Sequence, residues 1–212
     1  MANIKNIKIN TSIIIGLVLV LAIAGLYLLS RNNSAFQITL KEDDHFKGNP
    51  NASVVLVEYS DFSCSFCAYF FPIVEELTTN YENDLLFIYR HFPFHENSYL
   101  ASLASEAAGN QNAFWQMTEK LYSNQNEWVN LQDPSEFFIS YAQELNLNIE
   151  QFKNDLNSQE IEQKVKNDFN SAGKYGLTYT PSFFVNGVLI DNPRSYEEFA
   201  EIIENKIVEN AK

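Results

Sequence analysis

The sequence predicts an α/β fold that is interrupted by a long helical block, and three observations support this prediction. An apolar segment at residues 53–59 has the composition of a buried strand, and it leads through a short polar turn into a helix that begins at Cys64. Residues 97–172 have mostly helical periodicity. The pattern then returns to two short strands and a closing helix, so the helical block is an insertion within the fold.

The first part of the fold is expected to contain a strand, a helix and a second strand. Residues 64–81 carry apolar side chains at helical spacing, and residues 85–92 form an apolar run that ends before Pro93. Proline has no N–H group to donate to a strand ladder, so the second strand is expected to end there. The apolar residues of the helix are Phe66, Phe70, Ile73, Val74 and Leu77.

The second part consists of the helical block and the elements that follow it. Helices are expected at 97–109, 113–124, 135–145, 149–157 and 160–175, with asparagine and proline breaks between them. The aromatic residues between Phe114 and Trp128 recur at helical spacing, which indicates a packed core rather than a cofactor site. The closing elements are a hairpin with an Asn186-Gly187 turn and a helix over residues 195–209.

The N-terminal segment has the pattern of a membrane anchor. Residues 13–29 are uncharged and mostly apolar, and residues 1–12 carry Lys5 and Lys8 without any acidic residue. Lysines before the span favour a cytoplasmic N-terminus. We therefore predict a single-pass protein of the cell membrane, with a tether over residues 30–51 and an extracytoplasmic domain. A cleaved signal peptide is the alternative, and in both cases the domain is exported to a compartment that permits disulfides.

Composition limits the classes of partner. The chain has 212 residues, of which 46% are hydrophobic, so it can form a core of ordinary size. Its net charge is −13, which argues against binding to nucleic acids or to anionic membrane surfaces. The acidity itself indicates a solvated surface and identifies no substrate.

The two cysteines of the chain, Cys64 and Cys67, form a Cys-x-x-Cys motif at the start of the first helix. Residues at positions i and i+3 lie on one face of a helix, so a small adjustment allows a disulfide between them. The helix N-terminus offers free N–H groups and partial positive charge, which stabilise a thiolate. Cys64 is therefore the expected nucleophile, and Cys67 is the expected resolving thiol.

Two other uses of the cysteine pair remain open. A structural zinc site needs about four ligands, and His45, His91 and His95 would have to complete it. A static disulfide is the other alternative, although so short a loop constrains the unfolded chain weakly. We expect His91 and His95 to be structural, because Pro93 prevents a helical pair of ligands, and we expect no metal.

The order of elements and several motifs resemble the thioredoxin fold and, within it, the exported or membrane-anchored DsbA-like thiol-disulfide oxidoreductases of bacteria. The resemblance implies a thioredoxin-fold domain at 52–96 and 173–212 and a helical insertion at 97–172. The matching segments are Val57-Glu58-Tyr59-Ser60-Asp61-Phe62, Cys64-Ser65-Phe66-Cys67, Arg90-His91-Phe92-Pro93-Phe94, Ala113-Phe114-Trp115-Gln116-Met117 and Tyr179-Thr180-Pro181-Ser182-Phe183-Phe184-Val185-Asn186-Gly187.

The resemblance also implies the roles of individual residues. Cys64 and Cys67 match the family's redox-active disulfide, and Pro181, preceded by Thr180, matches the cis-proline that faces it. Glu58 matches a buried acid beneath the pair, with an outward-facing strand residue as the alternative. The best-known family oxidases have a histidine between the cysteines. This chain has Ser65-Phe66, so we expect a less oxidising pair.

The expected activity is the introduction of disulfide bonds into exported proteins. Unfolded or reduced exported proteins are the implied substrates, and a quinone-linked membrane partner of the DsbB or VKOR type is the implied reoxidase. No soluble cofactor is implied, and we expect a monomer. A reductase or isomerase on the same fold is one alternative, and a non-catalytic peptide-binding module with a structural disulfide is the other.

Overall fold

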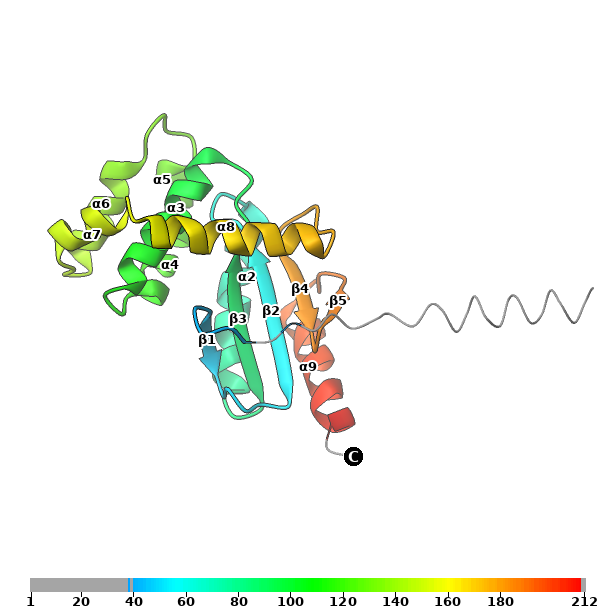
Figure 1. Ribbon diagram of the computed structural model, residues 1–212. Coiled ribbons are helices and arrows are strands. Elements are labelled where there is room, and N and C mark those ends of the chain that lie inside the picture. The colour runs from blue at the N-terminus through cyan, green and yellow to red at the C-terminus, as the bar shows by residue number, and fades with distance from the viewer. Residues whose placement is uncertain (1–37, 39, 211–212) are drawn as a thin grey trace, which may run out of the picture. The chain divides into compact units, whose positions relative to one another are not determined.

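The computed structural model of the chain describes Ile38 and residues 40–210. Five strands and eight helices are defined within these residues (Figure 1). The strands are β1 (His45–Gly48), β2 (Val54–Ser60), β3 (Leu85–His91), β4 (Ser182–Val185) and β5 (Val188–Ile190). The helices are α2 (Ser65–Asn80), α3 (Glu96–Gly109), α4 (Phe114–Ser123), α5 (Gln125–Trp128), α6 (Ser135–Glu144), α7 (Ile149–Asp155), α8 (Gln159–Lys174) and α9 (Tyr196–Asn210).

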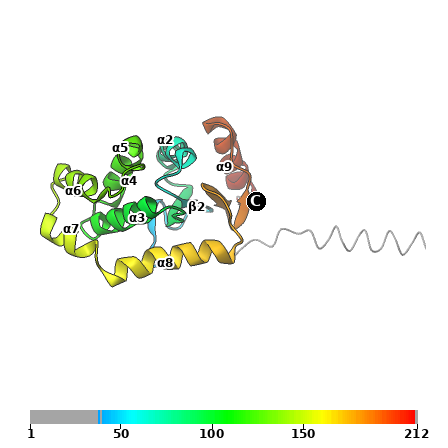
Figure 2. The same ribbon diagram turned by 90° about the horizontal axis from the view of Figure 1, so that it is seen from above.

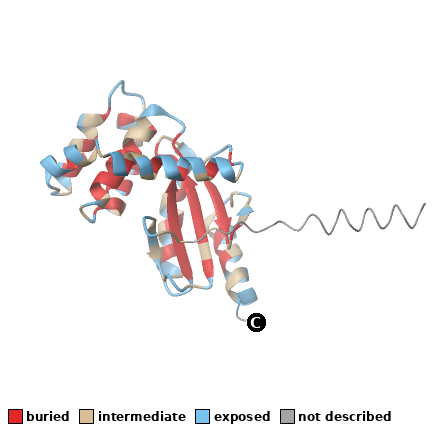
Figure 3. Ribbon diagram, viewed as in Figure 1, coloured by how far each residue is buried: buried red, intermediate tan, exposed pale blue. Residues whose placement is uncertain are grey.

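The strands form one mixed sheet in the order β1-β3-β2-β4-β5. The central strands β2 and β3 are parallel, and the other neighbours are antiparallel. Parallel strands are usually covered on both faces, which explains why β2 and β3 read as continuous apolar runs. Figure 3 shows the same pattern, because β2, β3 and β4 are buried whereas the edge strand β1 is partly exposed.

Helices cover both faces of the sheet. Figure 2 shows α2 and α9 on one side of the sheet and α8 on the other. The first face packs Leu56, Phe87 and Phe183 against apolar residues of α2 and α9, and the second packs Val57 and Phe184 against α8. The β2 side chains alternate between these faces, so Glu58 lies on the side of α2.

The insertion between β3 and β4 is helical, as the sequence predicts. Helices α3–α7 form a group beside one end of the sheet, and α8 leads from this group across the sheet to β4 (Figure 1). Trp128 is fully buried, and its ring centroid lies 5.3 Å from that of Phe138. The aromatic residues of this segment therefore supply a core for the insertion.

The N-terminal prediction needs one correction. The sequence predicts a tether over residues 30–51, but His45–Gly48 form strand β1, which pairs with β3. Four residues are too few to produce a recognisable sequence pattern. The strand is recognised only from its pairing with the edge of β3. The predicted anchor at 13–29 and the cytoplasmic segment at 1–12 lie outside the described residues. Among the helices that are described, none is long and apolar enough to cross a membrane.

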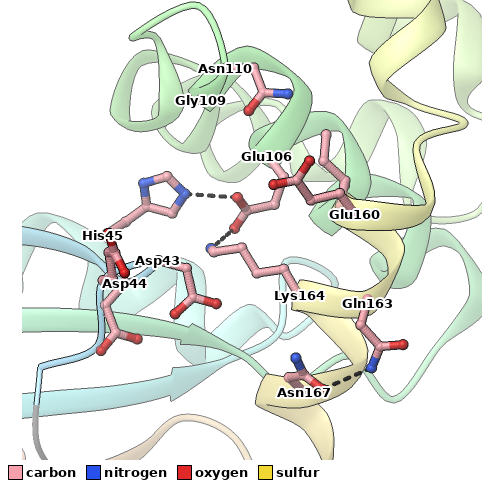
Figure 4. Close-up of a pocket in the computed structure, with 12 residues that line it drawn as sticks. Asp43, Asp44, His45, Glu106, Gly109, Asn110, Glu160, Gln163, Lys164 and Asn167 are labelled. Atoms are coloured by element: carbon pink, nitrogen blue, oxygen red, sulfur yellow. Dashed lines mark hydrogen bonds and ion pairs between the residues drawn. The ribbon is translucent and has the colours of Figure 1, made fainter.

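A buried ionic cluster joins the insertion to the sheet. Glu106 of α3 lies 2.9 Å from His45 Nε2 of β1 and 2.7 Å from His91 Nε2 of β3, and it also pairs with Lys164 of α8. Figure 4 shows His45 and Lys164 pointing toward the Glu106 carboxylate. His91 is therefore structural, as predicted, since it is fully buried and bonded to Glu106.

Candidate active site

The two cysteines lie where β2 meets α2. Cys64 is the N-cap residue of α2 and is half-buried, whereas Cys67 lies one turn inside the helix and is 0% exposed. Both are free thiols. The Cys67 sulfur accepts a hydrogen bond from the backbone N–H of Asp61 at 3.5 Å. A partner molecule can therefore reach the sulfur of Cys64 but not that of Cys67.

The surroundings of the two thiols move their pKa values in opposite directions. A hydrogen bond from the Cys67 thiol, helped by backbone N–H groups of Cys67 and Phe66, lowers the pKa of Cys64 to about 6. Burial raises the pKa of Cys67 well above its ordinary value, and the bond to Cys64 and the charge of Glu58 add to the effect. The reduced pair is thus organised as a thiolate at Cys64 that is solvated by the thiol of Cys67.

We expect Cys64 of the reduced protein to be alkylated with a pH midpoint near 6, while Cys67 stays unreactive to above pH 8. The thiolate is the reactive form, so the alkylation rate follows the ionised fraction. Iodoacetamide trapping across pH, read by peptide mass spectrometry, measures both sites, with Cys64→Ser as the unlabelled control. Prior labelling of Cys67, or a midpoint near the ordinary thiol pKa of about 8.5, would contradict this assignment.

Thr180 and Pro181 face the pair from the start of β4. The Thr180–Pro181 peptide bond is cis, and Cys64 Sγ lies 3.3 Å from the carbonyl oxygen of Thr180, to which the protonated thiol donates. Strand β4 lies beside β2, with Ser182 opposite Tyr59, which brings these residues together across more than 100 positions of sequence. The backbone before Pro181 is therefore positioned next to the reactive sulfur.

Glu58 is buried within the same layer as the cysteine pair. It is 4% exposed, and burial raises its pKa from 4.5 to about 8, against the effect of a hydrogen bond from Ser60. Its charge contributes to the raised pKa of Cys67, so the two groups are electrostatically coupled. The alternative of an outward-facing glutamate does not agree with this placement.

Two further residues hold the turn that carries Cys64, and neither was predicted. The carboxylate of Asp61 accepts hydrogen bonds from the backbone N–H of Ser63 at 2.6 Å and of Phe94 at 2.8 Å. Gln125 of α5 donates to the carbonyl oxygens of Phe62 at 2.7 Å and of Cys64 at 3.1 Å. The aspartate could have been found from its Asx-turn position, whereas Gln125 has no local signal.

The surface around Cys64 is aromatic. Phe66 is 67% exposed, and Tyr69 and Tyr179 are also exposed. A cleft of about 580 Å³ lies elsewhere, at the Glu106 cluster, and none of the cysteine-pair residues lines it. In the described part of the chain, no group of three histidine, cysteine or acidic residues is placed to hold a metal ion.

Comparisons with known proteins agree with this fold. The family model described as "Thioredoxin" matches residues 40–205. The structure of α-DsbA1 from Wolbachia pipientis is similar with a TM-score of 0.74 and 23% identity, covering 82% of this chain and 96% of that one. Oxidised BdbD from Bacillus subtilis has a TM-score of 0.70 and 26% identity, with 78% of this chain and 93% of that one covered.

Curated relatives share a smaller part of their length. The Na(+)/H(+) antiporter NhaA 1 of Mycobacterium sp. (strain KMS) is 37% identical over 153 residues, which is 69% of this chain but 24% of that protein. This chain thus spans about a quarter of the curated relatives it matches, and their name describes the whole of those proteins.

The chain belongs to the thioredoxin family, because the family model covers most of it. Its fold is similar to those of α-DsbA1 and BdbD, in agreement with the DsbA-like resemblance of its motifs.

Proposed function

We propose that this protein introduces disulfide bonds into exported polypeptides through the Cys64–Cys67 pair. The observation that carries the proposal is the contrast between the two sulfurs: Cys64 is accessible with a pKa lowered to about 6, and Cys67 is buried with a raised pKa. A stabilised thiolate at Cys64 favours the dithiol form over the disulfide form, which is the bias of an oxidant.

The reaction proceeds by two exchanges at sulfur. A substrate thiolate attacks Cys64 of the oxidised pair, a substrate–Cys64 disulfide forms, and the electron pair of the broken bond passes to Cys67. A second substrate thiolate then attacks the substrate sulfur of this mixed disulfide, and Cys64 leaves as a thiolate. Two substrate thiols are oxidised and the pair is reduced.

The proton of Cys67 needs a partner at the buried end of the pair. Cys67 leaves as a thiolate in a site that disfavours charge, and protonated Glu58 is the acid coupled to it. With its pKa raised to about 8, Glu58 holds a proton at neutral pH and supplies it to Cys67. The reverse transfer applies when Cys67 attacks a mixed disulfide.

The proposed substrates are reduced or unfolded exported proteins, whose extended backbone would lie along the Thr180–Pro181 segment beside exposed aromatic rings such as Phe66 and Tyr179. Reoxidation would come from a quinone-linked membrane protein of the DsbB or VKOR type. Family resemblance supports both assignments. The monomeric state expected from the sequence is part of the same proposal.

A redox titration of the full-length protein against glutathione tests the direction of the chemistry. We expect a potential above the roughly −270 mV of thioredoxin and below the roughly −120 mV of the strongest DsbA oxidants. The protein should oxidise a reduced model substrate faster than it reduces insulin, and its reduced form should unfold at higher denaturant concentration than its oxidised form. A more stable oxidised form would favour a reductase, and a pair that is inert to glutathione would indicate a structural staple.

We further propose that residues 13–29 anchor the protein in the cell membrane, with the catalytic domain outside the cytoplasm. The lysines before this uncharged run support the orientation. Cell fractionation and N-terminal sequencing of the mature protein measure the outcome. A soluble product that begins near Ala35 would show that the segment is a cleaved signal peptide.

A further inference from the structure

A line of buried hydroxyl groups leads from Glu58 into the helical insertion. The Ser60 hydroxyl donates to Glu58 Oε1 at 2.6 Å, and the Tyr122 hydroxyl lies 2.8 Å from Ser60 Oγ. The Tyr89 hydroxyl lies 3.2 Å from that of Tyr122. The four side chains are between 1% and 6% exposed, so these groups bond to one another rather than to bulk water.

Counting protons gives this line a direction. Ser60 has one hydroxyl proton, which it donates to Glu58, so its oxygen must accept the proton of Tyr122. The oxygen of Tyr122 then accepts from Tyr89. All three hydroxyl protons therefore point toward the carboxylate, and each donor has an acceptor when Glu58 is ionised.

Reversing the line is unfavourable. If protonated Glu58 donated to Ser60, every hydroxyl would turn, and the Tyr89 proton at the far end would need another acceptor. Within the described residues, the Tyr89 hydroxyl has no hydrogen-bond partner besides Tyr122. A buried donor without an acceptor is costly, so the line favours the ionised carboxylate and opposes the effect of burial.

We propose that Ser60 and Tyr122 are positioning residues of the exchange reaction, which hold the Glu58 carboxylate and set the pH at which it exchanges its proton with Cys67. The inference rests on the proposed function and adds to it a residue of the helical insertion, since Tyr122 lies on α4. The insertion would thereby influence the pH at which Glu58 exchanges its proton with Cys67.

Removing single hydroxyls separates this role from packing. Tyr122→Phe keeps the ring, whose centroid lies 4.9 Å from that of Phe62 and 5.3 Å from that of Phe71. Ser60→Ala removes the direct bond to Glu58. Tyr141→Phe is a matched control, because it removes a buried tyrosine hydroxyl from α6, outside the line.

Two readouts on the full-length protein test the proposal. The first is carbon-13 NMR of glutamate-labelled protein across pH, with Glu58→Gln identifying the Glu58 carboxyl signal. The second is the pH midpoint of the rate at which dithiothreitol reduces the Cys64–Cys67 disulfide. We expect both midpoints to rise by about 1 pH unit in Ser60→Ala, less in Tyr122→Phe, and not at all in Tyr141→Phe.

The Glu58→Gln background supplies the decisive comparison. Tyr122→Phe should shift the kinetic midpoint when Glu58 is present and leave it unchanged when glutamine replaces Glu58. Equal shifts in both backgrounds, no shift, or a downward shift would overturn the proposal. If the wild type has no exchange activity, the proposed function fails, while the carboxyl titration still tests the link between the hydroxyl line and Glu58.

Discussion

Cys64→Ser is expected to abolish thiol–disulfide exchange, and Cys67→Ser is expected to accumulate mixed disulfides with substrate proteins. Cys64 carries the accessible sulfur with the lowered pKa, so its loss removes the nucleophile. Cys67→Ser keeps that nucleophile, which attacks a disulfide of a partner protein and displaces one of its two sulfurs as a thiolate, but the variant lacks the thiol that would release the bound partner. Effective concentrations of well-oriented intramolecular reactions can reach about 10⁵ M or more, so the lifetime of the adducts should rise by orders of magnitude.

Non-reducing gels of cells that express each variant measure this difference. Cys67→Ser should give high-molecular-weight adducts that disappear when dithiothreitol reduces them, while Cys64→Ser and the double variant should give none. Ser65→Ala, which alters a neighbouring side chain of similar size, should exchange thiols like the wild type. Adducts in Cys64→Ser but not in Cys67→Ser would reverse the assigned roles.

The central elements of the fold were predictable because their signals are local. The expected strands at 53–59 and 85–92 correspond to Val54–Ser60 and Leu85–His91, and the expected helix at 149–157 corresponds to Ile149–Asp155. Long apolar runs, asparagine caps and proline breaks act within a few residues of chain. These signals required no knowledge of the packing.

Strand β1 and helix α5 were missed for the opposite reason. Each has four residues, too few for a recognisable periodicity, and each contacts a distant part of the chain. Strand β1 needs the edge of β3, and Gln125 of α5 bonds to the turn of Cys64, which lies 61 residues away in sequence. Propensity and periodicity contain no information about such partners.

The site residues also differ in whether the sequence around them could identify them. The Cys-x-x-Cys motif is local, and strand alternation placed Glu58 on the face of Val54 and Leu56, which the structure shows to be buried. By contrast, Tyr122 is indistinguishable from other core aromatics in the sequence, and its bond to Ser60 spans 62 residues. Residue types could be recognised from sequence, but the groups that adjust their chemistry required the fold.

Glu106→Gln is expected to reduce the free energy of unfolding by about 3 kcal/mol, the lower end of the range for breaking a buried ion pair. The Glu106 side chain is 5% exposed and faces His45, His91 and Lys164, whose side chains are 22%, 1% and 14% exposed. Glutamine retains one acceptor oxygen but leaves the lysine without a counter-charge in a largely buried site.

The loss of stability in Glu106→Gln is expected to depend on pH. Although burial opposes it, bonds from His45 and His91 and the charge of Lys164 hold the pKa of Glu106 well below 4.5. Burial lowers the pKa of His45 from 6.5. Both groups have a lower pKa in the folded protein than in the unfolded chain, so the unfolded chain binds protons more readily. The contribution of the two groups to the free energy of unfolding is therefore complete above pH 6.5, and it is lost as the pH falls through their folded-state pKa values.

Urea denaturation of wild type and Glu106→Gln between pH 2 and pH 8 tests both expectations. The difference between the two proteins should be largest at neutral pH and should shrink toward pH 4 and below, because acid removes the Glu106 charge from the wild type as well. Glu144→Gln is the matched control, since Glu144 is 57% exposed and pairs with Lys120, so its loss should cost less than about 1 kcal/mol. If Glu106→Gln were no more destabilising than Glu144→Gln, the desolvation of Glu106 and Lys164 would offset their attraction, and the cluster would contribute no net stability.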